Sequence, residues 1–233
     1  MLSAIADNLA AIEERIRAAC LRVGRDPAEV RLVAVSKTVP AERVREAVAA
    51  GITILGENYV QEARRKMDQL QGLPVSWHFI GHLQSNKAKV AVESFDWVHT
   101  LDRASLARAL NREALKLAKP LPVLLQVNVG EEQSKSGLAP EQVPAFFRSV
   151  GSLEALRVRG LMALPPYYED PERVRPHFRL LAAILEQLRQ VAPTPEELTE
   201  LSMGMSHDFE VAIEEGATLV RVGTAIFGER PAV

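Results

Sequence analysis

The 233-residue sequence predicts an α/β fold, a single (β/α)8 TIM barrel with an extra N-terminal helix. Strand-like and helix-like segments alternate along the chain, and eight strand-like runs are each reached through a crossover of helical length. Strands joined in this way pair in parallel, and eight such units in about 200 residues favour a closed barrel. A doubly wound open sheet is the alternative. It would usually carry a Gly-rich turn after its first strand, where this chain has SKTVP.

The expected elements follow in order from the N-terminus and form one domain, residues 1–233. Residues 1–25 are amphipathic and predict a helix packed on the outside of the barrel. The strands are expected at residues 31–36, 52–55, 76–80, 96–100, 122–129, 157–164, 197–203 and 218–222. The intervening helices are expected at 41–50, 58–70, 86–94, 103–118, 140–150, 171–192 and 207–216. Prolines at helix starts and glycines after helix ends agree with this division.

Composition and charge narrow the classes of partner. The net charge is -2, which does not suggest a polyanion, and we expect no nucleic-acid binding. The only cysteine, Cys20, excludes an intramolecular disulfide, and no Cys/His cluster has zinc-ligand spacing, so no metal site is expected. The N-terminus lacks the layout of a signal peptide, and no apolar run approaches the roughly 18 residues that span a bilayer. We therefore expect a cytoplasmic protein without membrane association.

The ends of the last two strands indicate an anion site. In a (β/α)8 barrel, functional groups gather at the C-terminal ends of the strands. SMGMSHD brings Ser202, Ser206 and a flexible glycine to a helix start, and Gly223 and Thr224 repeat the arrangement one unit later. Each loop alone is also explained as an ordinary N-cap or turn. Together, in the two places where such barrels often bind phosphate, they favour a phosphate site.

Lys37 ends the apolar run LVAVS and is expected to face this phosphate site across the barrel mouth. A solvated surface lysine is the ordinary interpretation. With a phosphate opposite, two others are open: Lys37 is a charge partner for the anion, or it is a Schiff-base amine activated by burial and cationic neighbours. Arg221, two residues before Gly223, is such a neighbour, and an inward arginine requires an acceptor. A barrel aldolase or isomerase acting on a sugar phosphate would use the same residues.

A set of motifs carries a resemblance to a known family. They are VAVSKT, GENYVQE, WHFIGHLQSNK, VNVGEEQSKSGL, GLMALPP and LSMGMSHDFEVAIEEGATLVRVGTAIFGER, in this order from Arg31 to Arg230. The sequence resembles the pyridoxal 5′-phosphate (PLP) homeostasis proteins of the YggS/PROSC type, which are similar in fold to the N-terminal barrel of alanine racemase. The resemblance implies that PLP is the cofactor and forms a Schiff base with Lys37.

The resemblance also implies the remaining contacts. Arg221 would face the pyridine nitrogen, Asn58 would line the ring pocket, and Met162 and His78 would lie nearby. The phosphate would bind at the loops after strands seven and eight. The implied cofactor-binding residues are Lys37, Asn58, Ser202, Ser206, Arg221, Gly223 and Thr224.

The function implied is PLP homeostasis, the holding and delivery of the cofactor inside the cell without robust catalysis. An arginine at the ring nitrogen disfavours ring protonation and makes the cofactor a weaker electron sink. The sequence ends at Val233, just after the barrel, so we expect no second domain to supply a racemase's tyrosine base. No residue is assigned a catalytic role, and a PLP-dependent amino-acid enzyme such as a weak racemase is the alternative. PLP-dependent apoenzymes are the expected recipients, and a monomer is expected.

Overall fold

Eight parallel strands form a closed barrel in which neighbours in sequence are neighbours in space and β8 pairs with β1. The structure is a computed structural model that describes residues 4–130 and 136–228. Part of the VNVGEEQSKSGL motif (131–135) and Arg230 lie outside these ranges. The predicted (β/α)8 class is confirmed. The strands are β1 (Arg31–Val35), β2 (Ile54–Glu57), β3 (Ser76–Phe79), β4 (Trp97–Leu101), β5 (Leu121–Val127), β6 (Leu156–Ala163), β7 (Glu200–Met205) and β8 (Leu219–Val222).

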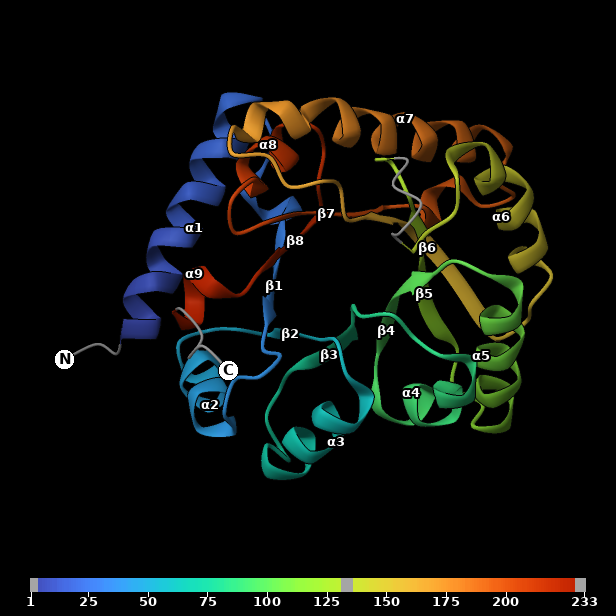
Figure 1. The fold of residues 1–233 in the computed structure, drawn as a ribbon, viewed down its shortest axis with the longest axis horizontal. Coiled ribbons are helices and arrows are strands. Elements are labelled where there is room, and N and C mark those ends of the chain that lie inside the picture. Colours follow the sequence, from blue (N-terminus) through green and yellow to red (C-terminus); the bar gives the residue numbers. More distant parts are fainter. Residues whose placement is uncertain (1–3, 131–135, 229–233) are drawn as a thin grey trace.

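Helices surround this barrel on its outside (Figure 1). In the described ranges they are α1 (Ala4–Arg22), α2 (Ala41–Ala49), α3 (Val60–Gln69), α4 (Ala88–Ser94), α5 (Ala104–Lys116), α6 (Val143–Gly151), α7 (Arg175–Val191), α8 (Phe209–Glu214) and α9 (Thr224–Phe227). Short 3-10 turns occur at Pro27–Glu29, Ser85–Lys87, Pro140–Gln142, Pro171–Val174 and Pro195–Glu197. None of these helices is long and apolar enough to cross a membrane.

The N-terminal helix α1 packs against α8 and α9, beside the last βα units of the barrel (Figure 1). Its apolar side chains recur at intervals of three or four residues and are buried, as expected for a helix that presents one face to a core. The amide of Asn8 donates to the Ile226 carbonyl at 3.0 Å. An ion pair of 2.7 Å joins Arg15 to Glu210 of α8. The helix is therefore held near the C-terminal part of the barrel by both apolar and polar contacts.

The observed β2 begins two residues later than the expected strand 52–55. Ile52 is buried, which is why it looks like part of the strand, but its N–H donates to the Ala47 carbonyl of α2 at 3.0 Å. Gly51, with φ of 115°, turns the chain at this helix end. Ile52 therefore belongs to the C-terminal turn of α2, and the ladder starts at Ile54.

A similar shift occurs at β7, which was expected at 197–203 and is found at Glu200–Met205. The preceding residues form a 3-10 turn, in which the Leu198 N–H donates to the Pro195 carbonyl at 3.1 Å. The apolar Leu198 is buried without being part of a strand. Both expected strands therefore start too early, because an apolar residue that is buried before the strand looks like part of it in the sequence.

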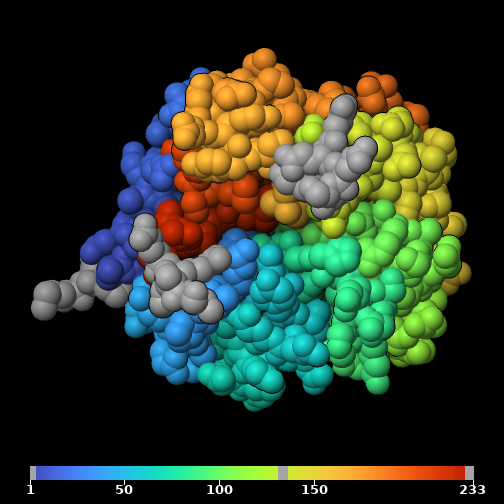
Figure 2. Space-filling view, viewed as in Figure 1, coloured from blue at the N-terminus to red at the C-terminus, as the bar shows by residue number. Residues whose placement is uncertain are grey.

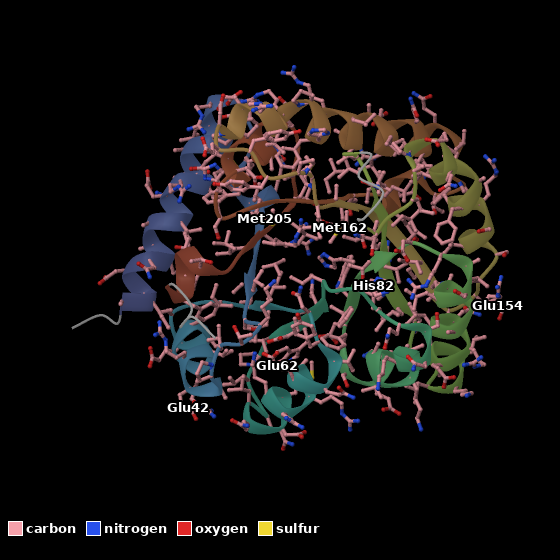
Figure 3. All side chains as sticks on the ribbon, viewed as in Figure 1. Glu42, Glu62, His82, Glu154, Met162 and Met205 are labelled. Atoms are coloured by element: carbon pink, nitrogen blue, oxygen red, sulfur yellow. The ribbon has the colours of Figure 1, made fainter. Side chains whose placement is uncertain are left out.

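The interior of the barrel is filled separately from the layer between strands and helices. Val33, Ile54, Leu124, Met162 and Leu219 form the apolar part of this inner core. Figure 3 shows Met162 near the centre of the barrel. Because side chains alternate along a strand, every second residue of a barrel strand points inward. The same alternation brings polar side chains into the barrel further along these strands.

Candidate functional site

A cavity of about 320 Å³ lies at the C-terminal ends of the strands, within the range of about 300 to 1,000 Å³ that small-molecule sites occupy. Its lining includes six of the seven predicted site residues: Lys37, Asn58, Ser206, Arg221, Gly223 and Thr224. The other lining side chains are mainly apolar or aromatic: Val35, Ile80, Leu164, Tyr167, Met205 and His207. In Figure 2 the red surface of the last βα units borders the blue surface of the first, and β1 and β8 pair directly.

Strand alternation explains why these residues converge. On β1, Val33 points into the barrel core, so Val35 and then Lys37 follow on the same face. On β8, Leu219 points inward and Arg221 and Gly223 follow. Both series reach the mouth of the barrel at the point where their strand ends. The sequence therefore determines that Lys37 and Arg221 share a cavity once the closed barrel is formed.

The loop that carries Lys37 is held in a strained conformation. Thr38 has φ of 62°, in the left-handed region that residues other than glycine rarely adopt. Its N–H donates to Glu62 Oε1 at 2.5 Å. One residue before Lys37, the Ser36 carbonyl accepts a hydrogen bond of 2.5 Å from Lys66 Nζ. Two groups of α3 thus fix the backbone on both sides of Lys37.

A buried ion pair lies behind this loop, on the outer face of the strands. Lys66 Nζ is 2.6 Å from Glu57 Oε1, which also accepts the Ser36 hydroxyl at 2.6 Å. Glu57 is fully buried and Lys66 is 5% exposed. Burial raises the pKa of the Glu57 carboxyl, and the Lys66 ammonium partly opposes this rise. The pair supports the Lys37 loop and does not reach the cavity itself.

Asn58 presents a buried acceptor that has no partner within the described structure. Its Oδ1 is buried and accepts no hydrogen bond there, although the residue lines the cavity. Buried amide oxygens are normally paired, so this atom favours a ligand that donates a hydrogen bond. Gly81 makes room for this residue, because a Cβ on Gly81 would lie 2.2 Å from the Asn58 carbonyl oxygen.

The loops after β7 and β8 meet at Ser206 and Gly223. The Gly223 N–H points to Ser206 Oγ at 3.4 Å, and Thr224 is exposed beside them. A Cβ on Gly223 would lie 3.2 Å from the Val35 carbonyl oxygen, so glycine permits the close approach of β8 to β1. Hydroxyl groups and backbone N–H groups of this kind suit a phosphate.

Arg221 closes the buried side of the cavity and is only 3% exposed. Its Nη1 donates to Ser202 Oγ at 2.6 Å and its Nη2 donates to the Ala163 carbonyl at 2.8 Å. Burial lowers the pKa of the guanidinium to about 10, and the charge of Asp208 opposes this shift. The group therefore stays charged at neutral pH while it is held by neutral acceptors.

Ser202 is set apart from the other predicted residues. It does not line the cavity; it lies fully buried inside the barrel, where its hydroxyl bonds to Arg221 and to His99 Nδ1 at 2.9 Å. Met162 and His78, which the resemblance places near the ring, are likewise buried in the barrel and absent from the cavity wall. The assignment of Ser202 to the phosphate-binding region stays a prediction, and its observed contact on the side of the cavity is with Arg221.

His99 is a buried polar residue that the sequence reasoning missed. It lies on β4 in the run DWVHT, two residues after Trp97, so the two side chains share the inward face of the strand. A polar residue on the inward face of an apolar barrel strand was the available signal. In the described parts of the chain, no group of three or more His, Cys, Asp or Glu side chains is placed to bind a metal ion.

Comparison with known proteins identifies the class of this barrel. The chain matches the family model for the N-terminal domain of alanine racemase over residues 7–231. A pyridoxal phosphate homeostasis protein of Pseudomonas aeruginosa is 51% identical over 231 residues, covering 98% of this chain and 97% of the relative. A protein of the same description from Aquifex aeolicus is 46% identical over 224 residues, covering 96% and 97%.

A solved structure agrees with these matches. PipY of Synechococcus elongatus PCC7942, determined with PLP bound, is 41% identical and superposes with a TM-score of 0.83. The alignment covers 96% of this chain and all of PipY. Fold and matched model together define a barrel of the alanine racemase N-terminal-domain class. Within that class, the chain belongs to the family of pyridoxal phosphate homeostasis proteins, and the resemblance carried by its motifs is confirmed.

Proposed function

We propose that this chain binds PLP in the cavity at the barrel mouth and acts in PLP homeostasis, with the Lys37 amine as the point of covalent attachment. One observation carries the proposal: a lysine, two hydroxyl groups and a buried guanidinium line a single cavity of about 320 Å³. The PLP-bound PipY structure supports the choice of ligand, because the relative shares the fold and 41% of the aligned residues.

The residues present fit the chemistry of PLP. The unpartnered Asn58 Oδ1 is an acceptor for the hydroxyl group on the cofactor ring. Ile80 and Leu164 offer apolar surface to the ring, and the hydroxyls of Ser206 and Thr224 offer donors to the phosphate. Ser202 then contributes indirectly, by holding Arg221.

Each side chain has a distinct role in this arrangement. The Lys37 amine would be the group that attaches to the PLP aldehyde, with loss of one water molecule. Arg221, which donates hydrogen bonds and cannot accept a proton, would face the ring nitrogen. When bound, PLP supplies a reactive aldehyde and an electron-withdrawing ring, which weakens as an electron sink when the nitrogen stays unprotonated. The site is therefore suited to holding the cofactor rather than to rapid turnover.

The visible spectrum of the purified protein tests this function. Protein loaded with PLP should absorb in the visible range, and borohydride should fix the cofactor on the peptide that contains Lys37. Lys37→Ala should abolish the fixed label, whereas Lys89→Ala, which changes an exposed lysine on α4, should leave it in place. Protein that takes up no PLP, or a label that persists in Lys37→Ala, would contradict the proposal.

Three further features stay predictions from the sequence: PLP-dependent apoenzymes as recipients, a monomeric state and a cytoplasmic location. Transfer of PLP from the loaded protein to an apoenzyme should outpace transfer from free PLP at the same concentration. Light scattering of the loaded protein should give the mass of one chain. Exchange of the Cα hydrogen of amino acids in deuterated solvent at enzymatic rates would favour the alternative of a PLP-dependent amino-acid enzyme.

A further inference from the structure

A row of hydrogen-bonded side chains runs through the barrel interior from the cavity to Ser76, at the N-terminal end of β3. Arg221 Nη1 and Ser202 Oγ are 2.6 Å apart, and Ser202 Oγ and His99 Nδ1 are 2.9 Å apart. His99 Nε2 lies 2.9 Å from His78 Nδ1, and His78 Nε2 lies 3.1 Å from Ser76 Oγ. Ser76 begins β3 and is 3.4 Å from Asp96 Oδ2, so the row ends on a carboxylate.

When both rings are neutral, the Asp96 end of this row fixes the direction of its hydrogen bonds: Ser76 donates to the carboxylate, so it accepts from His78 Nε2. At the other end the guanidinium only donates, so Ser202 Oγ accepts from Arg221, and its own proton is available for the His99 Nδ1 acceptor that this direction requires. His99 Nδ1 is then an acceptor, which makes Nε2 the protonated nitrogen of that ring. The same reasoning applies to His78, which accepts at Nδ1 and donates from Nε2 to Ser76. An ionised Asp96 only accepts, so the last proton points toward it.

The surroundings keep both rings neutral. His99 is fully buried, His78 is 1% exposed, and Trp97 stacks on His78 with centroids 5.4 Å apart. Burial is the main cause that lowers the pKa of His78 to about 3 and the pKa of His99 well below its ordinary value. The charged groups that face the rings are Arg31 and Arg221, and both oppose a further positive charge.

We propose that Ser202, His99 and His78 are positioning residues for Arg221: they form a one-way chain of neutral hydrogen bonds that holds the guanidinium at the buried side of the cavity. The chain gives Ser202 one orientation, with its lone pair toward Arg221 and its proton toward His99. Removing His99 would free the Ser202 hydroxyl to rotate, and Arg221 would lose a fixed acceptor. The expected change in the visible absorption band rests on the proposed PLP binding, whereas the chain of hydrogen bonds does not.

The first test uses the PLP-free protein and is independent of the proposed function. Nitrogen-15 spectra of the imidazole side chains should show His78 and His99 as neutral Nε2–H tautomers, and both should stay so down to about pH 5. An Nδ1–H tautomer in either ring, or protonation of either near its ordinary pKa, would overturn the chain. Failure of the protein to bind PLP would leave this result unchanged, so the two failures are distinguishable.

The second test uses the PLP-loaded protein. His99→Leu removes both hydrogen bonds of the ring, and we expect a three- to tenfold weaker PLP affinity, the effect of about one hydrogen bond, with a displaced visible absorption band. Ser202→Ala should displace the band in the same way, and His99→Gln, which can still accept and donate, should restore it in part. A control is His177→Gln, because that ring bonds to the Val129 carbonyl outside the barrel. A wild-type band and affinity in folded His99→Leu and Ser202→Ala would refute the positioning role.

Discussion

Two buried cations, Lys66 and Arg221, lie near the cavity, and they differ in the charge of their partners. Lys66, behind the Lys37 loop, is paired with the Glu57 carboxylate at 2.6 Å. Arg221, at the buried side of the cavity, bonds to the Ser202 hydroxyl and the Ala163 carbonyl, both neutral. Lys66 lies between the strands and α3, where a residue on the outer face of β2 can meet it. Arg221 lies on the inward face of β8, and its hydrogen-bond partners come from strands β6 and β7.

The difference determines how much charge each cation offers to a ligand. Glu57 largely cancels the charge of Lys66, so that pair fixes the backbone before Lys37 without a strong field at the cavity. The groups that hydrogen-bond Arg221 are neutral, and Asp208 acts on it only at longer range, so less of its charge is cancelled than that of Lys66. The outer region thus positions Lys37, the proposed attachment point, and the inner region supplies both position and positive charge.

The largest expected effect comes from breaking the outer pair. Lys66→Met leaves the fully buried Glu57 without its cation, and we expect the free energy of unfolding to fall by about 3 to 5 kcal/mol in urea titrations. The double variant Lys66→Met with Glu57→Leu should regain much of this loss, because no charge is then left behind. Lys89→Met, which removes an exposed cation 3.9 Å from Glu93, is the control and should leave stability unchanged. An equally stable Lys66→Met variant would show that the pair is not structural.

Removing the inner cation should cost less stability than removing the outer one. Arg221→Met leaves the Ser202 hydroxyl and the Ala163 carbonyl without this donor and removes a charge that acts on the buried Asp208, for an expected loss of about 1 to 3 kcal/mol. PLP binding should suffer far more than folding, because the charge at the cavity is lost. Urea unfolding and spectroscopic titration with PLP measure the two effects separately. If Arg221→Met destabilises the protein more than Lys66→Met does, the proposed difference between the two cations is contradicted.

The pH dependence of the free energy of unfolding should also differ between the inner histidines and the buried carboxyl groups. In the unfolded chain His78 takes up a proton below its ordinary pKa of 6.5, whereas in the folded chain its pKa is about 3. The unfolded state therefore binds more protons in this window, and the stability present above 6.5 is lost as the pH falls. Between about pH 6.5 and 5, His78→Phe should reduce this slope by about 1.4 kcal/mol per pH unit.

The carboxyl groups act with the opposite sign. Burial raises the pKa of Glu57 and of Asp208, so their contribution is full below the ordinary carboxyl pKa and declines as the pH rises. Comparing His78→Phe with the wild-type protein at each pH removes their effect, since both carboxyls are present in each. An unchanged slope in His78→Phe would contradict the neutral state of that ring.

The sequence was sufficient for the parts of the site that depend on strand order. Arg221 lies near the end of β8, and Lys37, Asn58 and Gly223 each follow a strand, so a closed barrel alone brings them together at its mouth. It was insufficient for side chains whose partners lie across the barrel. The bond between Ser202 and His99 joins residues 103 positions apart, and no local pattern encodes it.

The ion pair of Glu57 and Lys66 could not be predicted from the local sequence either. In GENYVQE, Glu57 has the ordinary appearance of an acid near a helix start, and nothing in the sequence distinguishes Lys66 from other lysines on a helix. The two residues are 9 positions apart, and their contact depends on how closely α3 packs against the barrel. The strain at Thr38 depends on the same packing, since α3 supplies the Glu62 that bonds its N–H.

The smallest expected effect concerns that strain. Thr38→Gly keeps the N–H that donates to Glu62 and relieves the left-handed backbone, which costs a residue other than glycine about 1 to 2 kcal/mol. Glycine loses about 0.5 to 1 kcal/mol more entropy on folding, so the net gain in stability should be about 0.5 to 1 kcal/mol. Ala118→Gly is a matched control, because Ala118 has φ of 49° at the end of α5. Both variants should unfold at higher urea concentration, but Thr38→Gly alone should weaken PLP binding, because only there does added flexibility reach Lys37. Equal PLP affinity in the two variants would mean that the ion pair, without the rigid turn, is enough to position the lysine.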